Sequence, residues 1–433
     1  MLRFVLISCV CSAATGVVGW NVRFSEYFGR VDAEPWQREH PAPPTPQVRP
    51  GPHVVEVVQT RRIVPGEGLP PEAEVYTANN NLDVVRHTDG RVYLAWRTAP
   101  SHFAGSQTVI NVVSSADEVS WRFESRFALG TDLREPRFLP MGDRLLLYVS
   151  RLGSNPFDFE PAGMSVSERD AGGRWGALQA TGPTGFIGWR ARWVAGRALM
   201  IGYVGGGSIY SLTREPLSLR VLTTHDGLTW QPAFGTRAEV LRGGGSEADF
   251  HIDADGRLTA LVRNEAGDEG GFGSKLCAAE PEAPAQWRCR DDQRKFDSPL
   301  LFSHDGQVYA VARRNRTLDG LYDVARGPWW WRLARNQLDY ITTAKRCALW
   351  RLDPAHQTID FVLDLPSRGD TCFASVLPGR TPSEVVLYDY SSPLDGPDLP
   401  WAAGQRRPTY IYRHVLAFSP GRDAPVREVD TAP

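Results

Sequence analysis

Short runs of alternating apolar and polar residues recur along the chain, and turn signals separate them. In RVYLAW (91–96) and QVYAVA (307–312) the apolar residues alternate as in a strand with one buried face. Both runs follow an Asp-Gly pair, which favours the tight turn of a β-hairpin. No long stretch shows the spacing of an amphipathic helix. The pattern therefore predicts short antiparallel strands.

These hairpins form a repeat. Six turn glycines lie 50 to 73 residues apart: Gly90, Gly142, Gly196, Gly256, Gly306 and, in a weaker copy, Gly379. A tryptophan late in four units keeps steps of 54 to 57 residues: Trp121, Trp175, Trp230 and Trp287. Two markers with one period indicate real repeats, each about as long as a four-stranded sheet. We expect an all-β fold, a six-bladed β-propeller of four-stranded antiparallel blades. Five blades plus an irregular segment are the alternative.

The ends of the chain differ from the repeats. Arg3 is followed by an apolar run that is typical of a secretory signal and is short for a membrane span. The residues LISC (6–9) also fit a lipobox in which Cys9 would be acylated, so we expect a secreted or periplasmic protein, or a lipoprotein. The expected division is a signal peptide at 1–19, a proline-rich extension at 20–72, the propeller at 73–418 and a tail at 419–433.

The four cysteines after the signal are an even number in an exported chain. We expect the disulfides Cys277–Cys289 and Cys347–Cys372, with four free buried thiols as the alternative. No CxxC or histidine spacing accompanies these cysteines, so no metal site is expected.

Charge excludes one class of partner. The chain has 433 residues, with 48 Lys and Arg against 50 Asp and Glu, so it offers no basic field for a phosphate backbone. Nucleic acid is therefore not an expected partner. We expect a monomer without a cofactor.

A spacing of sixteen residues recurs around the turns. Glu247 and Arg263 are sixteen apart, and the midpoint falls in the turn Asp255-Gly256, so a hairpin should bring the two side chains together at its open end. The same spacing joins Asn81 to Arg97, Glu135 to Arg151 and Asp297 to Arg313. In a propeller these positions share one rim. Each pair could be a simple cross-strand ion pair.

A ring of converging carboxylates has further consequences. Glu135, Glu247, Asp249 and Asp297 would face one cavity, and carboxylates brought together repel, so at least one should keep its proton near neutral pH. An acid and a carboxylate are what cleavage of a glycosidic bond requires. We expect Glu247 and Asp297 to be the working pair, with Glu135 or Asp249 modulating them.

Other residues of the rim would bind substrate. The third unit departs from the spacing and places Trp189, Arg190 and Arg192 before its turn. Arginines can orient hydroxyls or a carboxylate, amides supply hydrogen bonds, and tryptophans offer flat faces to a sugar ring. The expected binding residues are Asn81, Arg97, Arg151, Trp189, Arg190, Arg263, Arg313 and Asp370.

Two motifs resemble those of sialidases. TTHDGLTW (223–230) looks like the Asp-box turn of these enzymes, one residue shorter between Asp226 and Trp230. The stretch from Glu247 through Asp255-Gly256 to Arg263 resembles a sialidase pattern in which the glutamate assists the nucleophile and the arginine binds the substrate carboxylate. The resemblance covers roughly residues 73 to 418 and implies a sialidase-like propeller with a glycan substrate.

The chain also departs from sialidases. It lacks their early F/Y-R-I-P motif, for which LREPRF (133–138) is the nearest match. Aligning Val376-Leu377-Pro378 with the motif around the nucleophilic tyrosine places Thr371 at the tyrosine position. A secreted glycoside hydrolase is therefore expected, and a non-catalytic glycan- or protein-binding propeller and a polysaccharide lyase are the alternatives.

An insertion lengthens the fifth unit. It spans residues 320–340 and contains three consecutive tryptophans, Trp329, Trp330 and Trp331. We expect them to plug the flank of the propeller, and a lid or sugar platform at the rim is the alternative. Asn315-Arg316-Thr317 fits a glycosylation sequon.

Overall fold

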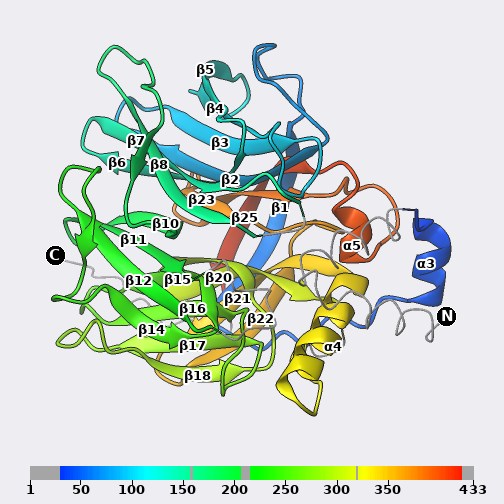
Figure 1. Cartoon of the computed structure of the whole chain (residues 1–433). Helices are drawn as coiled ribbons and strands as arrows, with labels where there is room; N and C mark the ends of the chain where they lie inside the picture. The colour runs from blue at the N-terminus through cyan, green and yellow to red at the C-terminus, as the bar shows by residue number, and fades with distance from the viewer. Residues whose placement is uncertain (1–29, 157–158, 206–214, 318–319, 422–433) are drawn as a thin grey trace, which may run out of the picture.

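The computed structural model of the chain describes residues 30–156, 159–205, 215–317 and 320–421. Six antiparallel sheets surround a central axis (Figure 1). This confirms the six-bladed propeller. The predicted signal segment with Cys9 and the last twelve residues of the tail lie outside the described residues.

The first three blades follow one another along the chain. Blade 1 contains β2 (Ala78–Arg86), β3 (Val92–Ala99), β4 (Val109–Ser115) and β5 (Arg122–Phe127). Blade 2 contains β6 (Asp132–Met141), β7 (Arg144–Leu152), β8 (Pro161–Arg169) and β9 (Gln179–Thr181). Blade 3 contains β10 (Ile187–Val194), β11 (Arg197–Val204), β12 (Leu217–Thr224), β13 (Gln231–Pro232) and a fifth strand, β14 (Glu239–Gly243).

The last three blades include the closure of the ring. Blade 4 contains β15 (Gly245–Ile252), β16 (Leu258–Asn264), β17 (Ser274–Ala279) and β18 (Arg288–Asp292). Blade 5 contains β19 (Asp297–His304), β20 (Gln307–Asn315), β21 (Lys345–Asp353) and β22 (Thr358–Asp364). Blade 6 contains β23 (Ser375–Pro378), β24 (Glu384–Ser391) and β25 (Tyr410–Pro420), and its outer strand is β1 (His53–Val64). Because β1 comes from the N-terminal extension, the two ends of the chain meet in one sheet.

Turn glycines fix the hairpins where the alternation predicted them. Gly90 and Gly256 have φ angles of 80° and 83°, a left-handed conformation that costs glycine little. Neighbouring sheets then bury their facing sides in separate apolar clusters. One cluster joins blades 3 and 4 through Ile201, Leu219 and Phe250, and comparable clusters fill the other five interfaces. The six sheets therefore pack face to face around the axis, and the pairing of β1 with β25 closes the ring.

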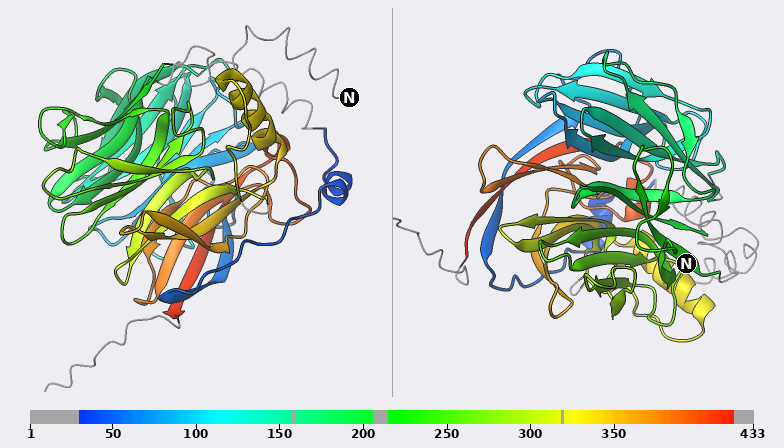
Figure 2. Two further views of the ribbon diagram at one scale, coloured as in Figure 1. Left: turned by 90° about the horizontal axis from the view of Figure 1, so that it is seen from below. Right: turned by 90° about the vertical axis from the view of Figure 1, so that its left-hand side faces the viewer.

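Three helices lie on the same side of the ring, at the right in Figure 1: α3 (Ala33–Glu39), α4 (Trp329–Thr342) and α5 (Trp401–Gly404). Figure 2 shows α4 beside the ends of the sheets. The expectation that no long helix occurs is wrong for α4, whose buried face includes Leu333, Gln337 and Tyr340. No described helix is both long and apolar enough to span a membrane.

The three consecutive tryptophans of α4 differ in how far they are exposed. Trp329 packs beside Phe272, with ring centroids 6.1 Å apart, whereas Trp330 and Trp331 are 58% and 42% exposed. Only Trp329 therefore fits the expected plug. The sequon residue Asn315 is buried in β20, which argues against its glycosylation.

Both predicted disulfides are present. Cys277 and Cys289 are cross-strand partners on β17 and β18. Cys347 on β21 is bonded to Cys372, just before β23, and this bond links blade 5 to blade 6.

The turn between β12 and β13 offers a test of local stability. Asp226 Oδ1 accepts hydrogen bonds from the backbone N–H groups of Leu228 and Thr229 at 2.8 and 2.7 Å. Asp226→Ala should lower the free energy of unfolding by about 1 kcal/mol, because a typical hydrogen bond contributes about 0.5–1.5 kcal/mol. Urea unfolding measures the change. Asp226→Asn keeps an acceptor and should lose less, so equal losses in both variants would contradict this role.

Candidate functional site

The inner strands of five blades carry a β-bulge at the same end. The register shifts between Asn80 and Leu82, Arg134 and Arg137, Gly188 and Arg190, Gly245 and Ala248, and Asp297 and Leu300. A bulge leaves extra residues unpaired and turns their side chains out of the sheet. The bulge residues Asn81, Glu135 and Ser298 have left-handed φ angles of 42°, 52° and 53°. Repeated strain at equivalent positions indicates that this end of the ring is built for a site.

These bulges surround a cavity of ≈ 170 Å³. Its lining includes the bulge residues Asn81, Glu135, Trp189, Ser246, Glu247 and Ser298. Other lining side chains come from neighbouring strands and loops: His102, Arg134, Arg263, Arg313, Tyr390 and Trp401. Two carboxylates, three guanidinium groups and several aromatic rings therefore share one pocket.

Of the two carboxylates in the cavity, Glu135 lies farther from its nearest arginine. Its Oε1 accepts a hydrogen bond from Asn81 Nδ2 at 3.0 Å, and Arg137 Nη2 lies 4.0 Å from Oε2. Oε2 has no hydrogen-bond partner among the described residues. Burial raises the pKa of Glu135 to about 7, against the attraction of Arg137 and with a further contribution from Glu247. Burial contributes more to this shift than the neighbouring carboxylate of Glu247 does.

Glu247 has a different environment. Oε1 forms an ion pair with Arg263 Nη1, and Oε2 accepts the backbone N–H of Ser298 at 2.7 Å. The predicted contact between Glu247 and Arg263 is confirmed. An arginine and a backbone N–H therefore fix the position of this carboxylate. The cavity thus combines a buried carboxyl whose pKa is raised with a second carboxylate that is paired to an arginine.

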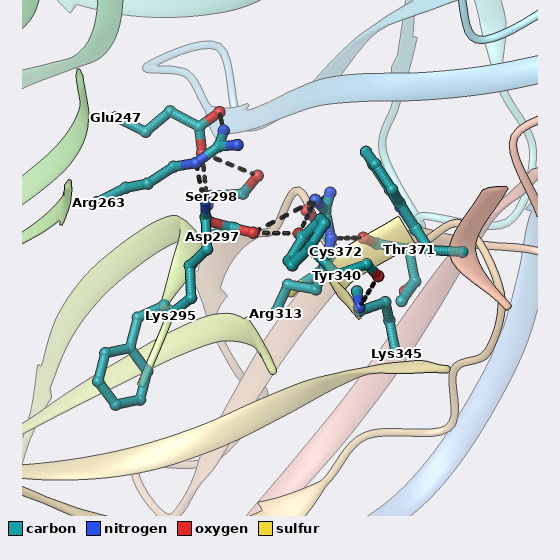
Figure 3. A network of polar contacts seen from close by, with 12 residues as sticks. Glu247, Arg263, Lys295, Asp297, Ser298, Arg313, Tyr340, Lys345, Thr371 and Cys372 are labelled. Carbon is teal, nitrogen blue, oxygen red and sulfur yellow. Dashed lines mark hydrogen bonds and ion pairs between the residues drawn. The ribbon is translucent and has the colours of Figure 1, made fainter. Parts of the chain in front are cut away.

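A buried polar network lies behind Glu247 (Figure 3). Asp297 is fully buried, its Oδ1 lies 2.8 Å from Arg263 Nε, and Tyr340 of α4 donates to its Oδ2. Tyr340 also accepts from Arg313 Nη1 at 3.1 Å. Asp297 is not part of the cavity lining, but it contacts Arg263 directly and Arg313 through Tyr340, and both arginines line the cavity.

The structure brings six of the twelve predicted site residues to the lining: Asn81, Glu135, Trp189, Glu247, Arg263 and Arg313. It does not bring Arg97, Arg151, Arg190, Asp249, Asp297 or Asp370 there. Arg97 is buried against Asp132, with Nη2 and Oδ1 2.8 Å apart. Arg190 donates to the carbonyls of Pro299 and Ala374, and Arg192 is paired with Asp249. Arg151 donates to the carbonyl of Ala162 at 3.3 Å.

The bulges explain this division. Asp297 and Arg313, which are sixteen residues apart, are paired directly across β19 and β20. Arg97 is instead paired with Asn80, and Arg151 with Leu133, so the expected opposition of Asn81 to Arg97 and of Glu135 to Arg151 is wrong. The extra bulge residues turn Asn81 and Glu135 toward the axis while their expected arginines stay in the sheet.

The lining residues that had not been assigned to the site from the sequence include His102, Arg134, Tyr390 and Trp401. His102 Nδ1, Tyr390 Oη and Trp401 Nε1 lie 2.6, 3.0 and 3.2 Å from the carboxylate of Asp370. Thr371, at the position aligned with the sialidase tyrosine, is fully buried and donates to the carbonyl of Tyr390 at 2.8 Å. Contacts between residues so distant in the chain leave no local sequence pattern.

Potential metal ligands gather elsewhere. In the described part of the chain two groups qualify by proximity, His53 with His304 and Asp305, and the disulfide Cys347–Cys372 with Asp389. None of these residues contributes to the cavity lining.

Comparison with known proteins supports the architecture. No protein-family model matches the chain, and no curated protein matches its sequence. A mutant of Trypanosoma rangeli sialidase that displays trans-sialidase activity has a TM-score of 0.53 at 16% identity, over 86% of this chain and 60% of that one. Trypanosoma rangeli sialidase has a TM-score of 0.51 at 16% identity, over 79% and 55% of the two chains. A Penicillium chrysogenum α-L-arabinanase complexed with arabinobiose has a TM-score of 0.47 at 12% identity, over 85% and 98%.

At such identities the likeness establishes the fold, which is a sialidase-like six-bladed β-propeller. The chain spans 60% and 55% of the length of the two sialidase chains.

Proposed function

We propose that this protein is an exported glycoside hydrolase that cleaves a glycosidic bond in the central cavity. The observation that carries the proposal is that Glu135 and Glu247 share one cavity in different surroundings: burial raises the pKa of Glu135, and Glu247 is paired with Arg263. Hydrolysis of a glycoside needs an acid for the leaving oxygen and a carboxylate beside the anomeric carbon. The two disulfides support an oxidising compartment as the place of action.

In this proposal Glu135 is the general acid. Its carboxyl gives its proton to the glycosidic oxygen as the bond from that oxygen to the anomeric carbon breaks. Glu247, held by Arg263 and by the N–H of Ser298, faces the positive charge that develops on the sugar ring. Asp297, expected from the sequence to be one of the working pair, instead anchors Arg263 from behind.

The substrate is proposed to be a glycan bound by the remaining lining groups. Arg134 and Arg313 can donate paired hydrogen bonds to hydroxyl or carboxylate oxygens. Trp189 and Trp401 can pack against a sugar ring. The experiment that tests the function is incubation of the purified chain with defined oligosaccharides, with new reducing ends measured over time.

The pKa of Glu135 predicts how activity depends on pH. The acid must be protonated to act, and burial raises its pKa to about 7. In mildly acidic solution Glu135 stays protonated, so its titration should not change the rate of glycan release. Above pH 7 the rate should fall about tenfold per pH unit. The rate is measured with one oligosaccharide at fixed ionic strength. A rate that stays constant up to pH 9 would exclude Glu135 as the acid.

A further inference from the structure

Asp370 places a negative charge directly behind a histidine of the cavity. Its carboxylate is fully buried and lies 2.6 Å from His102 Nδ1. Tyr390 donates to the same carboxylate at 3.0 Å and Trp401 at 3.2 Å. His102 comes from the loop after β3 in blade 1, and Asp370 precedes the inner strand of blade 6. Donors from two blades and α5 therefore fix this carboxylate.

The short contact assigns the proton of the neutral imidazole. A carboxylate at 2.6 Å requires N–H at Nδ1, and Asn80 Nδ2, at 3.4 Å from the same nitrogen, is a weaker competitor. The lone pair is then on Nε2, and both hydrogen bonds of the ring to described residues involve Nδ1. The side chain is 16% exposed and contributes to the cavity lining. His102 can therefore accept a proton from a group bound in the cavity.

The proposed hydrolysis needs such an acceptor. Both oxygens of Glu247 already accept hydrogen bonds from fixed donors, Arg263 and the N–H of Ser298. At the position aligned with the tyrosine nucleophile stands Thr371, whose hydroxyl is buried and bonded to the carbonyl of Tyr390. His102 belongs to blade 1, which lies across the six-bladed ring from blade 4, the blade of Glu247.

We propose that His102 is the base that activates water in this cavity, and that Asp370 is its positioning residue. The inference rests on the proposed glycoside hydrolase function. The oxygen of water forms a bond to the anomeric carbon while one of its protons moves to His102 Nε2. The bond to the leaving oxygen breaks, and that oxygen takes the proton of Glu135. The imidazolium that forms is stabilised by Asp370, and solvent restores both groups. Direct attack by water inverts the anomeric configuration.

Burial supports the neutral state of His102. Burial lowers its pKa below the usual value, Asp370 opposes this shift, and Arg134 and Arg97 contribute to it. A base must be unprotonated, so the rate of hydrolysis should decrease on the acid side as His102 gains its proton. Asp370→Asn removes the charge that raises the pKa of His102, so this decrease should move to lower pH.

The test compares three variants. His102→Gln can still donate to Asp370 but cannot accept the proton, so glycan release should fall about 10²–10⁴-fold. His225→Gln is the control, because His225 is exposed in the turn after β12 and should leave the rate unchanged. Asp370→Asn should lower the rate and shift the acid side of the pH profile. Proton NMR of the first product gives its anomeric configuration.

The outcomes separate this inference from the proposed function. Glycan release by His102→Gln within about threefold of the unchanged protein, or retention of configuration, would overturn the base role and leave the hydrolase intact. Absence of release by the unchanged protein would overturn both. Nitrogen NMR of the His102 ring tests the dyad independently of turnover: a proton on Nδ1 that is lost or weakened in Asp370→Asn supports it, and a proton on Nε2 in the unchanged protein overturns it.

Discussion

Glu135→Gln is expected to lower the rate of glycan release about 10²–10⁴-fold, the usual contribution of a general acid. Glutamine keeps the shape of the side chain and can still bond to Asn81, but it has no proton to give to the leaving oxygen. Substrate binding should persist because the arginines and tryptophans of the cavity are unchanged. The measurements are initial rates of release and, separately, binding of the intact oligosaccharide by calorimetry.

Two controls make this result specific to proton transfer. A glycoside whose leaving group is already acidic needs little protonation, so Glu135→Gln should cleave it at a rate close to that of the unchanged protein. Glu72→Gln removes an exposed carboxylate and should change neither rate. Equal losses on acidic and ordinary leaving groups would contradict the role of Glu135 as the acid.

Asp132→Ala is expected to lower the free energy of unfolding by about 3–5 kcal/mol, because it leaves a buried guanidinium without its counter-ion. Arg97 and Asp132 are both fully buried, and Asp132 Oδ1 accepts from Arg97 Nε at 3.0 Å and from Nη2 at 2.8 Å. Thr108 Oγ1 donates to the same oxygen at 2.8 Å. The loss is measured by urea unfolding at neutral pH.

A surface pair and a double variant complete this test. Glu280→Ala breaks an ion pair with Arg257 whose side chains are 54% and 50% exposed, so it should cost only about 0–1 kcal/mol. Replacing both Arg97 and Asp132 by apolar residues of similar volume should recover much of the stability lost in Asp132→Ala. A cost for Asp132→Ala as small as that for Glu280→Ala would contradict the structural role of the buried pair.

The sequence predicted the repeating features of the fold well. Turn glycines such as Gly90 and Gly256 mark the first hairpin of blades 1 to 5, because glycine takes the left-handed angle there at little cost. Their spacing gave the number of blades, and the spacing of Glu247 and Arg263 gave a real contact. The closing strand β1 was missed because it pairs with β25, at the far end of the chain.

The site was less predictable, for identifiable physical reasons. A bulge adds one or two residues without disturbing the alternation around it, so the sequence did not show that Glu135 leaves the sheet. The buried face of α4 includes the polar side chains Asn336 and Gln337, which hid its helical spacing. His102 and Asp370 are 268 residues apart, and only the closed ring brings them together.

The most direct test of the proposed hydrolysis is a library of defined glycans incubated with the purified chain and analysed by mass spectrometry. Hydrolysis predicts that at least one glycan gives fragments whose combined mass exceeds that of the parent by one water, and that Glu135→Gln suppresses these fragments. Fragments whose combined mass equals that of the parent, with a new double bond, would indicate elimination. Glycans that bind but stay intact would contradict the catalytic account and indicate a binding propeller.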